Sequence, residues 1–122
     1  MNTLSKEEIE LIRSKFDGIP NEYFDWLTIY GCGKHESGYN IYSEPVDSAE
    51  IFGELSQRNT GYFLVIGTKG WDGWIGYKYK GEEGIWELIL HDAYTFNIDP
   101  ISEGLEDFLK VNAKRSLVPL IP

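Results

Sequence analysis

The stretch Tyr62–Leu90 reads YFLVIGTKGWDGWIGYKYKGEEGIWELIL, and it decides the fold class of the chain. Three runs rich in Val, Ile, Tyr, Phe and Trp are separated by two runs rich in Gly. The first group of residues fits a pleated, half-buried surface, whereas Gly allows tight connections. The pairs Asp72-Gly73 and Glu83-Gly84 are typical of turn tips. The stretch therefore predicts three consecutive strands joined by short turns.

The residues before this stretch predict two short amphipathic helices. Leu4–Ile9 has the form of a capping box, in which Ser5 accepts a hydrogen bond from the Glu8 amide and Glu8 reaches back to the cap amide. The helix is expected to end near Asp17-Gly18, and a second helix is expected after Pro20. Apolar residues at three- and four-residue spacing give each helix one buried side. These residues are Ile9, Ile12 and Phe16 in the first helix and Tyr23, Phe24, Leu27 and Tyr30 in the second, which Gly31 ends.

Shorter elements are expected on both sides of the three strands. A short strand is predicted at 40–43, ending before Pro45, and Asp47–Glu50 predicts a helix that continues to about Gln57. Residues 92–98 predict a further strand or a crossing loop. A last helix is expected from about Ser102, with Leu105, Phe108 and Leu109 on its buried side, and the tail beyond Asn112 is expected to be partly extended.

The order of these elements predicts an α+β fold in a single domain, residues 1–122. Its sheet is expected to be antiparallel or mixed, with about five to six strands, and the N-terminal and C-terminal helices are expected to cover one face. At 122 residues with 42% hydrophobic residues, the chain has enough apolar material for one core. The uncovered face or rim is then available for a binding surface.

The charge of the chain is strongly negative and unevenly placed. There are 20 Asp and Glu against 11 Lys and Arg, a formal net charge of -9. Between Lys34 and Arg58 every charged residue is acidic. Such a field repels nucleic acid and anionic membranes, because both are bound through Lys and Arg, and it attracts a basic protein. The plainer interpretation is that the charge keeps the protein soluble.

The sequence offers few groups for catalysis or metal binding. Cys32 and His35 have a C-x-x-H spacing, but the paired spacing of a zinc site is missing, and a turn is the favoured interpretation. His91 and Asp92 are neighbours in an expected strand, so their side chains point to opposite faces, which favours a polar pair at a strand end over an acid/base pair. We therefore expect no enzyme activity, no catalytic residue, no metal ligand and no cofactor.

The location of the protein is expected to be cytoplasmic. The first ten residues, MNTLSKEEIE, lack the apolar centre of a signal peptide and the Arg-rich character of a transit peptide. No stretch has the length and apolarity of a membrane span. One cysteine permits no intramolecular disulfide, which fits a reducing compartment.

The candidate partner-binding residues are exposed acids and aromatics. Trp71 lies in a glycine-rich turn that does not easily bury two indoles, and a turn-borne Trp suits a protein interface. Trp74 is expected to pack into the sheet, and Trp26 and Trp86 are expected in the core. The full set of candidates is Trp71, Asp72, Glu44, Asp47, Glu50, Glu54, Glu82, Glu83, Asp92 and Tyr94.

Several segments, in their order along the chain, resemble the SUKH (Smi/Knr-like) superfamily. Residues 19–27, IPNEYFDWL, are followed by the turn Tyr30–Gly33 and later by the strands FLVIG at 63–67 and WIGYKY at 74–79. IWEL at 85–88 and LEDFL at 105–109 are similar to the family's next strand and closing helix. The chain departs from the family in having Tyr-Gly-Cys-Gly where Asn-Gly-Gly is commoner, and in a short middle region.

This resemblance implies an α+β fold with helices packed on a sheet, and no enzymatic activity. The superfamily includes a fungal regulator of cell-wall synthesis and bacterial immunity proteins of polymorphic toxin systems. It therefore implies a protein that binds and neutralises a cognate toxin, a nuclease or deaminase, which the charge of this chain suggests is basic. The alternative is a non-enzymatic regulator or scaffold that binds a cellular protein. Neither expectation fixes an oligomeric state.

Overall fold

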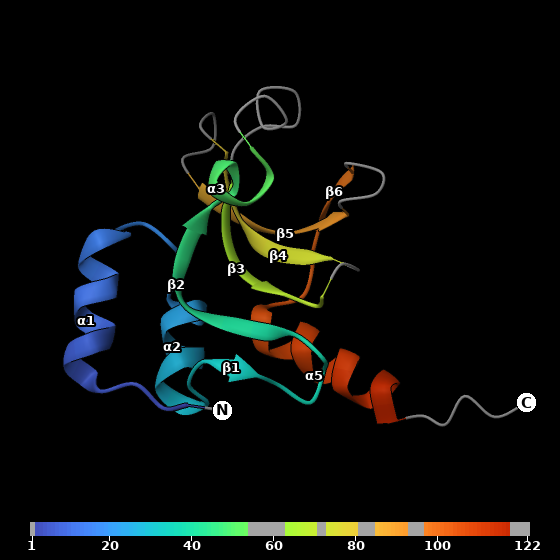
Figure 1. The fold of residues 1–122 in the computed structure, drawn as a ribbon, viewed down its shortest axis with the longest axis horizontal. Coiled ribbons are helices and arrows are strands. Elements are labelled where there is room, and N and C mark those ends of the chain that lie inside the picture. Colours follow the sequence, from blue (N-terminus) through green and yellow to red (C-terminus); the bar gives the residue numbers. More distant parts are fainter. Residues whose placement is uncertain (1, 54–62, 71–72, 81–84, 93–96, 118–122) are drawn as a thin grey trace, which may run out of the picture.

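Six strands form one antiparallel sheet in which each strand pairs with the next one along the chain (Figure 1). The computed structural model describes residues 2–53, 63–70, 73–80, 85–92 and 97–117. The strands are β1 Gly33–Lys34, β2 Asn40–Asp47, β3 Leu64–Thr68, β4 Trp74–Lys80, β5 Ile85–Asp92 and β6 Asn97–Pro100. The helices in these ranges are α1 Lys6–Lys15, α2 Asn21–Ile29, α3 Ser48–Phe52 and α5 Leu105–Leu117. The predicted α+β class and strand number are confirmed.

The larger core lies between the sheet and the helices α1, α2 and α5. In Figure 1 these helices lie along the left and lower sides of the sheet. Leu27 of α2, Tyr77 of β4 and Leu109 of α5 are fully buried in this core. Apolar residues at helical spacing on three helices and alternate residues of the strands supply it. The predicted buried residues Ile9, Ile12, Tyr23, Phe24, Trp26, Leu27, Leu105 and Leu109 all belong to it.

The opposite face of the sheet has a smaller core of its own, which corrects the expectation of helices on one face only. Phe52 of α3 packs there against Phe63, Trp74 and Ile89. Because strand residues alternate between faces, Val65 lies in this smaller core while Ile66 lies in the larger one. The strands β3–β5 are thus buried on both sides in this region. The predicted packing of Trp74 into the sheet is confirmed, since its exposed fraction is 5%.

The three central strands follow the sequence prediction. β4 pairs with β5 from Trp74↔His91 to Lys80↔Ile85 without interruption. Gly76 of β4 lies so close to β3 that a Cβ atom there would stand 2.3 Å from the carbonyl oxygen of Leu64. Of the four predicted turn residues, Asp72, Glu83 and Gly84 lie outside the described residues.

The helix ends agree with the local signals at the N-terminus and differ at the C-terminus. Ser5 Oγ accepts from the Glu8 amide at 3.1 Å and Glu8 accepts from the Ser5 amide at 3.3 Å, which confirms the capping box. Helix α5 continues beyond Asn112 to Leu117, so the prediction of a partly extended tail is wrong for residues 113–117, and residues 118–122 lie outside the described residues. Ala113 explains the difference, because it is buried and continues the stripe of Leu105 and Leu109 at a spacing of four.

Three predicted boundaries near β2 and β6 are also wrong. β2 continues through Pro45 to Asp47. Helix α3 ends at Phe52 and not near Gln57, because Gly53 adopts a φ of 91° that other residues rarely take. In the C-terminal half, β5 extends to Asp92 and the next strand occupies Asn97–Pro100, where one strand or loop was expected over 92–98.

Candidate partner-binding groove

A long bulge in β2 creates the most distinctive surface of the molecule. β2 pairs with β3 at Ile41↔Gly67 and again at Val46↔Val65. Residues 42–45 of β2 therefore lie opposite the single residue Ile66 of β3. Pro45 suits this position, because a bulge does not require the backbone N–H that proline lacks. The bulge therefore bends β2 sharply, and its side chains do not alternate regularly between the two faces of the sheet.

A buried tyrosine of helix α2 holds the bulge in place. The hydroxyl of Tyr23 donates a hydrogen bond to the carbonyl oxygen of Tyr42 at 2.7 Å. Tyr23 is fully buried. Burial raises the pKa of Tyr23 far above its usual value, and the neighbouring Cys32 and Glu44 act in the same direction. The phenol therefore stays protonated and remains a donor to the bulge.

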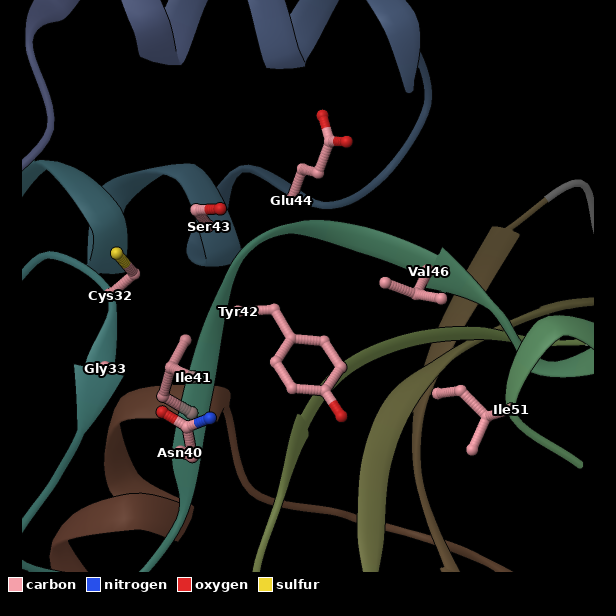
Figure 2. Close-up of a pocket in the computed structure, with 9 residues that line it drawn as sticks. All are labelled: Cys32, Gly33, Asn40, Ile41, Tyr42, Ser43, Glu44, Val46 and Ile51. Atoms are coloured by element: carbon pink, nitrogen blue, oxygen red, sulfur yellow. The ribbon is translucent and has the colours of Figure 1, made fainter.

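The bulge borders a shallow groove of about 450 Å³, which we call the β2 groove (Figure 2). In Figure 2, Tyr42 and Val46 of β2 and Ile51 of α3 lie on one side of the strand, and Glu44 projects from the other side toward α1. The groove runs from the β1 end of β2 to α3. Its lining residues are Cys32, Gly33, Asn40, Ile41, Tyr42, Ser43, Glu44, Val46 and Ile51.

The groove has an apolar centre. As its acidic rim we define Glu44, which lines the groove, and the exposed residues Asp47 and Glu50, which are next in sequence to the lining residues Val46 and Ile51. Ile51 is 36% exposed, and Tyr42 and Val46 are partly exposed beside it. The carboxylates of Glu44, Asp47 and Glu50 are exposed at β2 and the first turn of α3. An apolar centre with a polar rim is the usual anatomy of a protein interface. The arrangement suits contact with a protein surface better than chemistry on a small molecule.

Two of the rim carboxylates, those of Asp47 and Glu44, have local contacts within the protein. Asp47 caps α3, because its Oδ1 accepts from the Ala49 amide at 2.8 Å. Glu44 lies 3.9 Å from the ammonium group of Lys15 on α1, and both side chains are about half exposed. A pair of this length and exposure contributes little to stability.

Of the ten predicted binding residues, Glu44 lines the groove, and Asp47 and Glu50 are exposed next in sequence to its lining residues. Asp92 lies on another element, at the end of β5. The other six, Glu54, Trp71, Asp72, Glu82, Glu83 and Tyr94, lie outside the described residues.

The apolar centre of the groove was not predicted from the sequence. Tyr42 and Val46 are separated by the bulge, so the alternation that marks one face of a strand is broken between them. Ile51 follows the helix cap at Asp47, and nothing in the local sequence separates it from the more buried Phe52. The available signal was Pro45, which marks a bulge or an edge when it lies inside an apolar strand.

His91 has an environment that differs from the expected polar pair at a strand end. Its ring is fully buried, 4.7 Å from the ring of Phe52 and 5.2 Å from that of Phe63, measured between centroids. Neither ring nitrogen has a hydrogen-bond partner among the residues described. Burial lowers the pKa of His91, and the nearby Asp92 opposes this shift. Because it is enclosed by aromatic rings, the imidazole is placed for packing in the smaller core.

The C-x-x-H pair also has a structural environment. The backbone of Cys32 forms two hydrogen bonds with that of Asn2, at 2.7 and 2.8 Å. His35 Nδ1 accepts from the Ser37 amide at 3.2 Å, and burial lowers the pKa of this histidine while Glu36 opposes the shift. Over the described ranges, no group of three His, Cys, Asp or Glu side chains is arranged to hold a metal ion.

A second acidic site lies between α2 and α5. It is a cavity of about 100 Å³ lined by Glu22, Asp25, Trp26, Ile29, Tyr30 and Glu106. Two of its carboxylates are engaged within the protein. Glu22 accepts from the Leu105 amide at 3.2 Å, and Glu106 accepts from the Tyr30 hydroxyl at 2.7 Å and pairs with Lys110 at 3.0 Å. The hydrogen bonds from Tyr30 and Lys110 lower the pKa of the Glu106 carboxyl, and the bond from Tyr30 has the larger effect.

Comparison of the chain with models of protein families, with curated proteins and with solved structures found no match. Among the residues described, no helix has both the length and the apolar character needed to cross a membrane.

Proposed function

We propose that this protein is an immunity protein of the SUKH type that binds and neutralises a basic cognate toxin, a nuclease or deaminase, in the cytosol. The observation that carries the proposal is the β2 groove, where an apolar centre is lined by Glu44 and where the exposed acids Asp47 and Glu50 are next in sequence to lining residues. The segments that resemble the superfamily supply the kind of partner. The protein acts in this proposal by covering its partner, without making or breaking a bond.

The charge of the chain supports a basic partner. A formal net charge of -9 produces a field that speeds the approach of a positively charged protein and disfavours nucleic acid. A nuclease that binds nucleic acid carries Lys and Arg around its active site, because the phosphates must be neutralised. An acidic inhibitor can therefore occupy the same basic site as the substrate and block it.

The test is co-expression with the toxin encoded beside the gene. We expect the protein to restore growth of cells that produce the toxin, and to form a one-to-one complex with its toxic domain in size-exclusion chromatography. The association rate should fall steeply between about 50 and 500 mM salt, because screening shortens the range of the attraction. Absence of both growth rescue and complex formation would reject the proposed function.

A further inference from the structure

We infer that the β2 groove receives an extended segment of the partner in which one apolar side chain is flanked by Lys or Arg. This inference rests on the proposed function in taking the partner to be a protein. It goes further in assigning the contact to one surface and in stating the chemistry of the segment that fits it. The grounds are the shape of the bulge, the apolar centre and the charge of the rim.

The apolar centre sets the first requirement. Tyr42, Val46 and Ile51 come from two elements and meet beside the bend of β2 (Figure 2). Tyr42 is anchored on both sides, since its carbonyl accepts from Tyr23 and its hydroxyl is hydrogen-bonded to Trp74. A rigid aromatic ring with two aliphatic neighbours is a good site for one apolar side chain, because little entropy is lost on contact.

The rim sets the second requirement. Glu44 lines the groove and projects from the side of β2 that faces α1 (Figure 2). Asp47 and Glu50 are exposed, and they are next in sequence to the lining residues Val46 and Ile51. The contact of Glu44 with Lys15 is long and exposed, so Glu44 can exchange this partner for a cation of the bound segment at little cost. No lining residue of the groove is basic. A segment with cations on both sides of its apolar residue matches this pattern.

Two alternatives fit less well, namely a second copy of this chain as the occupant of the groove and the cavity at Asp25 as the binding site. A second copy of this chain would meet the groove through a two-fold axis, which places the rim of one copy against the same acidic rim of the other. Such like-charge contacts oppose association. The cavity at Asp25 is smaller, about 100 Å³, and the carboxylates of Glu22 and Glu106 beside it already have partners within the protein.

The experiment uses the full chain, labelled with ¹⁵N, and two synthetic peptides. One is acetyl-Gly-Arg-Ile-Lys-Gly-amide, and the other has Glu in place of Arg and Lys. At constant ionic strength we expect the basic peptide to shift the amide signals of residues 42–44 and 46–51 with millimolar affinity. The acidic peptide should leave them unchanged.

Matched variants separate the groove from general charge and apolarity. Ile51→Glu and Glu44→Lys should each weaken binding of the basic peptide at least tenfold. Leu11→Glu on α1 and Asp25→Lys on α2 make the same chemical changes at exposed sites outside the groove, and they should alter binding less than twofold. Ile51→Ala and Glu44→Gln repeat the test with smaller changes if either first variant loses the dispersed spectrum of a folded protein.

The possible results decide between the alternatives. Equal binding of the two peptides, signals that shift around Asp25 in place of residues 42–51, or no shift at millimolar peptide would overturn the inference. A dimer that Ile51→Glu abolishes would assign the groove to a second copy and would also overturn it. If the toxin complex forms and the groove variants bind the toxin as tightly as the wild type, the inference fails and the proposed function stands. If the basic peptide binds the groove but neither growth rescue nor a toxin complex is found, the inference stands and the proposed function fails.

Discussion

The hydroxyl of Tyr77 in β4 donates a hydrogen bond to Glu22 Oε2 in α2, so the centre of the sheet is tied to a helix by one buried phenol. The other oxygen, Oε1, accepts from the Leu105 amide at 3.2 Å, at the first residue of α5. Burial raises the pKa of Tyr77 far above its usual value, and the bond to Glu22 acts in the same direction. One carboxylate thereby links α2, β4 and α5.

Tyr77→Phe should lower the free energy of unfolding by about 1.5 to 3 kcal/mol, the usual range for a hydrogen bond to a charged group. The substitution keeps the packing of the ring and leaves Glu22 with one partner fewer. Urea unfolding followed by tryptophan fluorescence measures the change. Tyr79→Phe in the same strand is the control, because Tyr79 is 50% exposed and its loss of a hydroxyl should cost less than about 0.5 kcal/mol. Equal effects of the two variants would contradict the assigned link.

The stability of the protein should depend on the protonation of His91. Burial holds the pKa of His91 in the folded protein below its ordinary value of 6.5, to which it returns on unfolding. Below pH 6.5 the unfolded chain therefore binds a proton that the folded protein does not bind. The free energy of unfolding is highest above this pH and falls as the pH decreases toward the folded-state pKa.

Measurement of urea unfolding between pH 8 and 5 checks this dependence. His91→Phe should flatten the curve below pH 6.5, because it keeps an aromatic ring in the smaller core and removes the titrating group. His35 needs its own variant, since burial also lowers its pKa and gives a loss of the same sign. If His35→Gln flattens the curve and His91→Phe leaves it unchanged, the assignment to His91 is wrong.

Gly76 should be among the least replaceable residues of the sheet. An added Cβ would stand 2.3 Å from the carbonyl oxygen of Leu64, and backbone atoms inside a sheet cannot move aside without breaking strand pairing. We expect Gly76→Ala to lower the free energy of unfolding by about 3 kcal/mol or more. Gly73→Ala is the matched control, because its Cβ would lie at ordinary contact distances, 3.4 Å from Cδ1 of Leu90 and 3.7 Å from the carbonyl oxygen of His91. Thermal unfolding of both variants tests the contrast, and similar transition temperatures would disprove it.

Tyr23→Phe should destabilise the bulge of β2. It leaves the carbonyl oxygen of Tyr42 without its buried donor, which costs about 1 to 3 kcal/mol. The same variant should weaken binding of the basic peptide to the β2 groove, since Tyr42 loses one of its anchors. Isothermal titration and urea unfolding report the two effects separately. Loss of stability with unchanged peptide affinity would show that the groove does not depend on this hydrogen bond.

The features predicted correctly from sequence are those determined by neighbours along the chain. Ser5 and Glu8 are three residues apart, and their capping box forms as expected. The strands within Tyr62–Leu90 follow from their own composition and from the glycines between them. Local chemistry was sufficient in both cases, since no distant residue is needed to select the conformation.

The features that were missed depend on distant contacts. β2 passes through Pro45 because Tyr23, 19 residues before Tyr42, supplies a donor to the bulge. His91 looked like a polar strand end, but Phe52 and Phe63 from two other elements enclose it. The candidate site shows the same division. The acids Glu44, Asp47 and Glu50 could be picked out from the sequence as charged residues, but the apolar centre of the groove forms only in the folded protein.

The separation of the two cores by one sheet has a consequence for how this protein can evolve. The helices and the sheet face beneath them hold most of the buried apolar residues. Tyr42 packs against the smaller core, and Val46 and Ile51 line the groove and belong to neither core. Substitutions at Val46 and Ile51 can therefore accumulate with little effect on the main folding unit. If the groove binds the toxin as proposed, a few mutations can re-target it while the architecture that carries it is inherited intact.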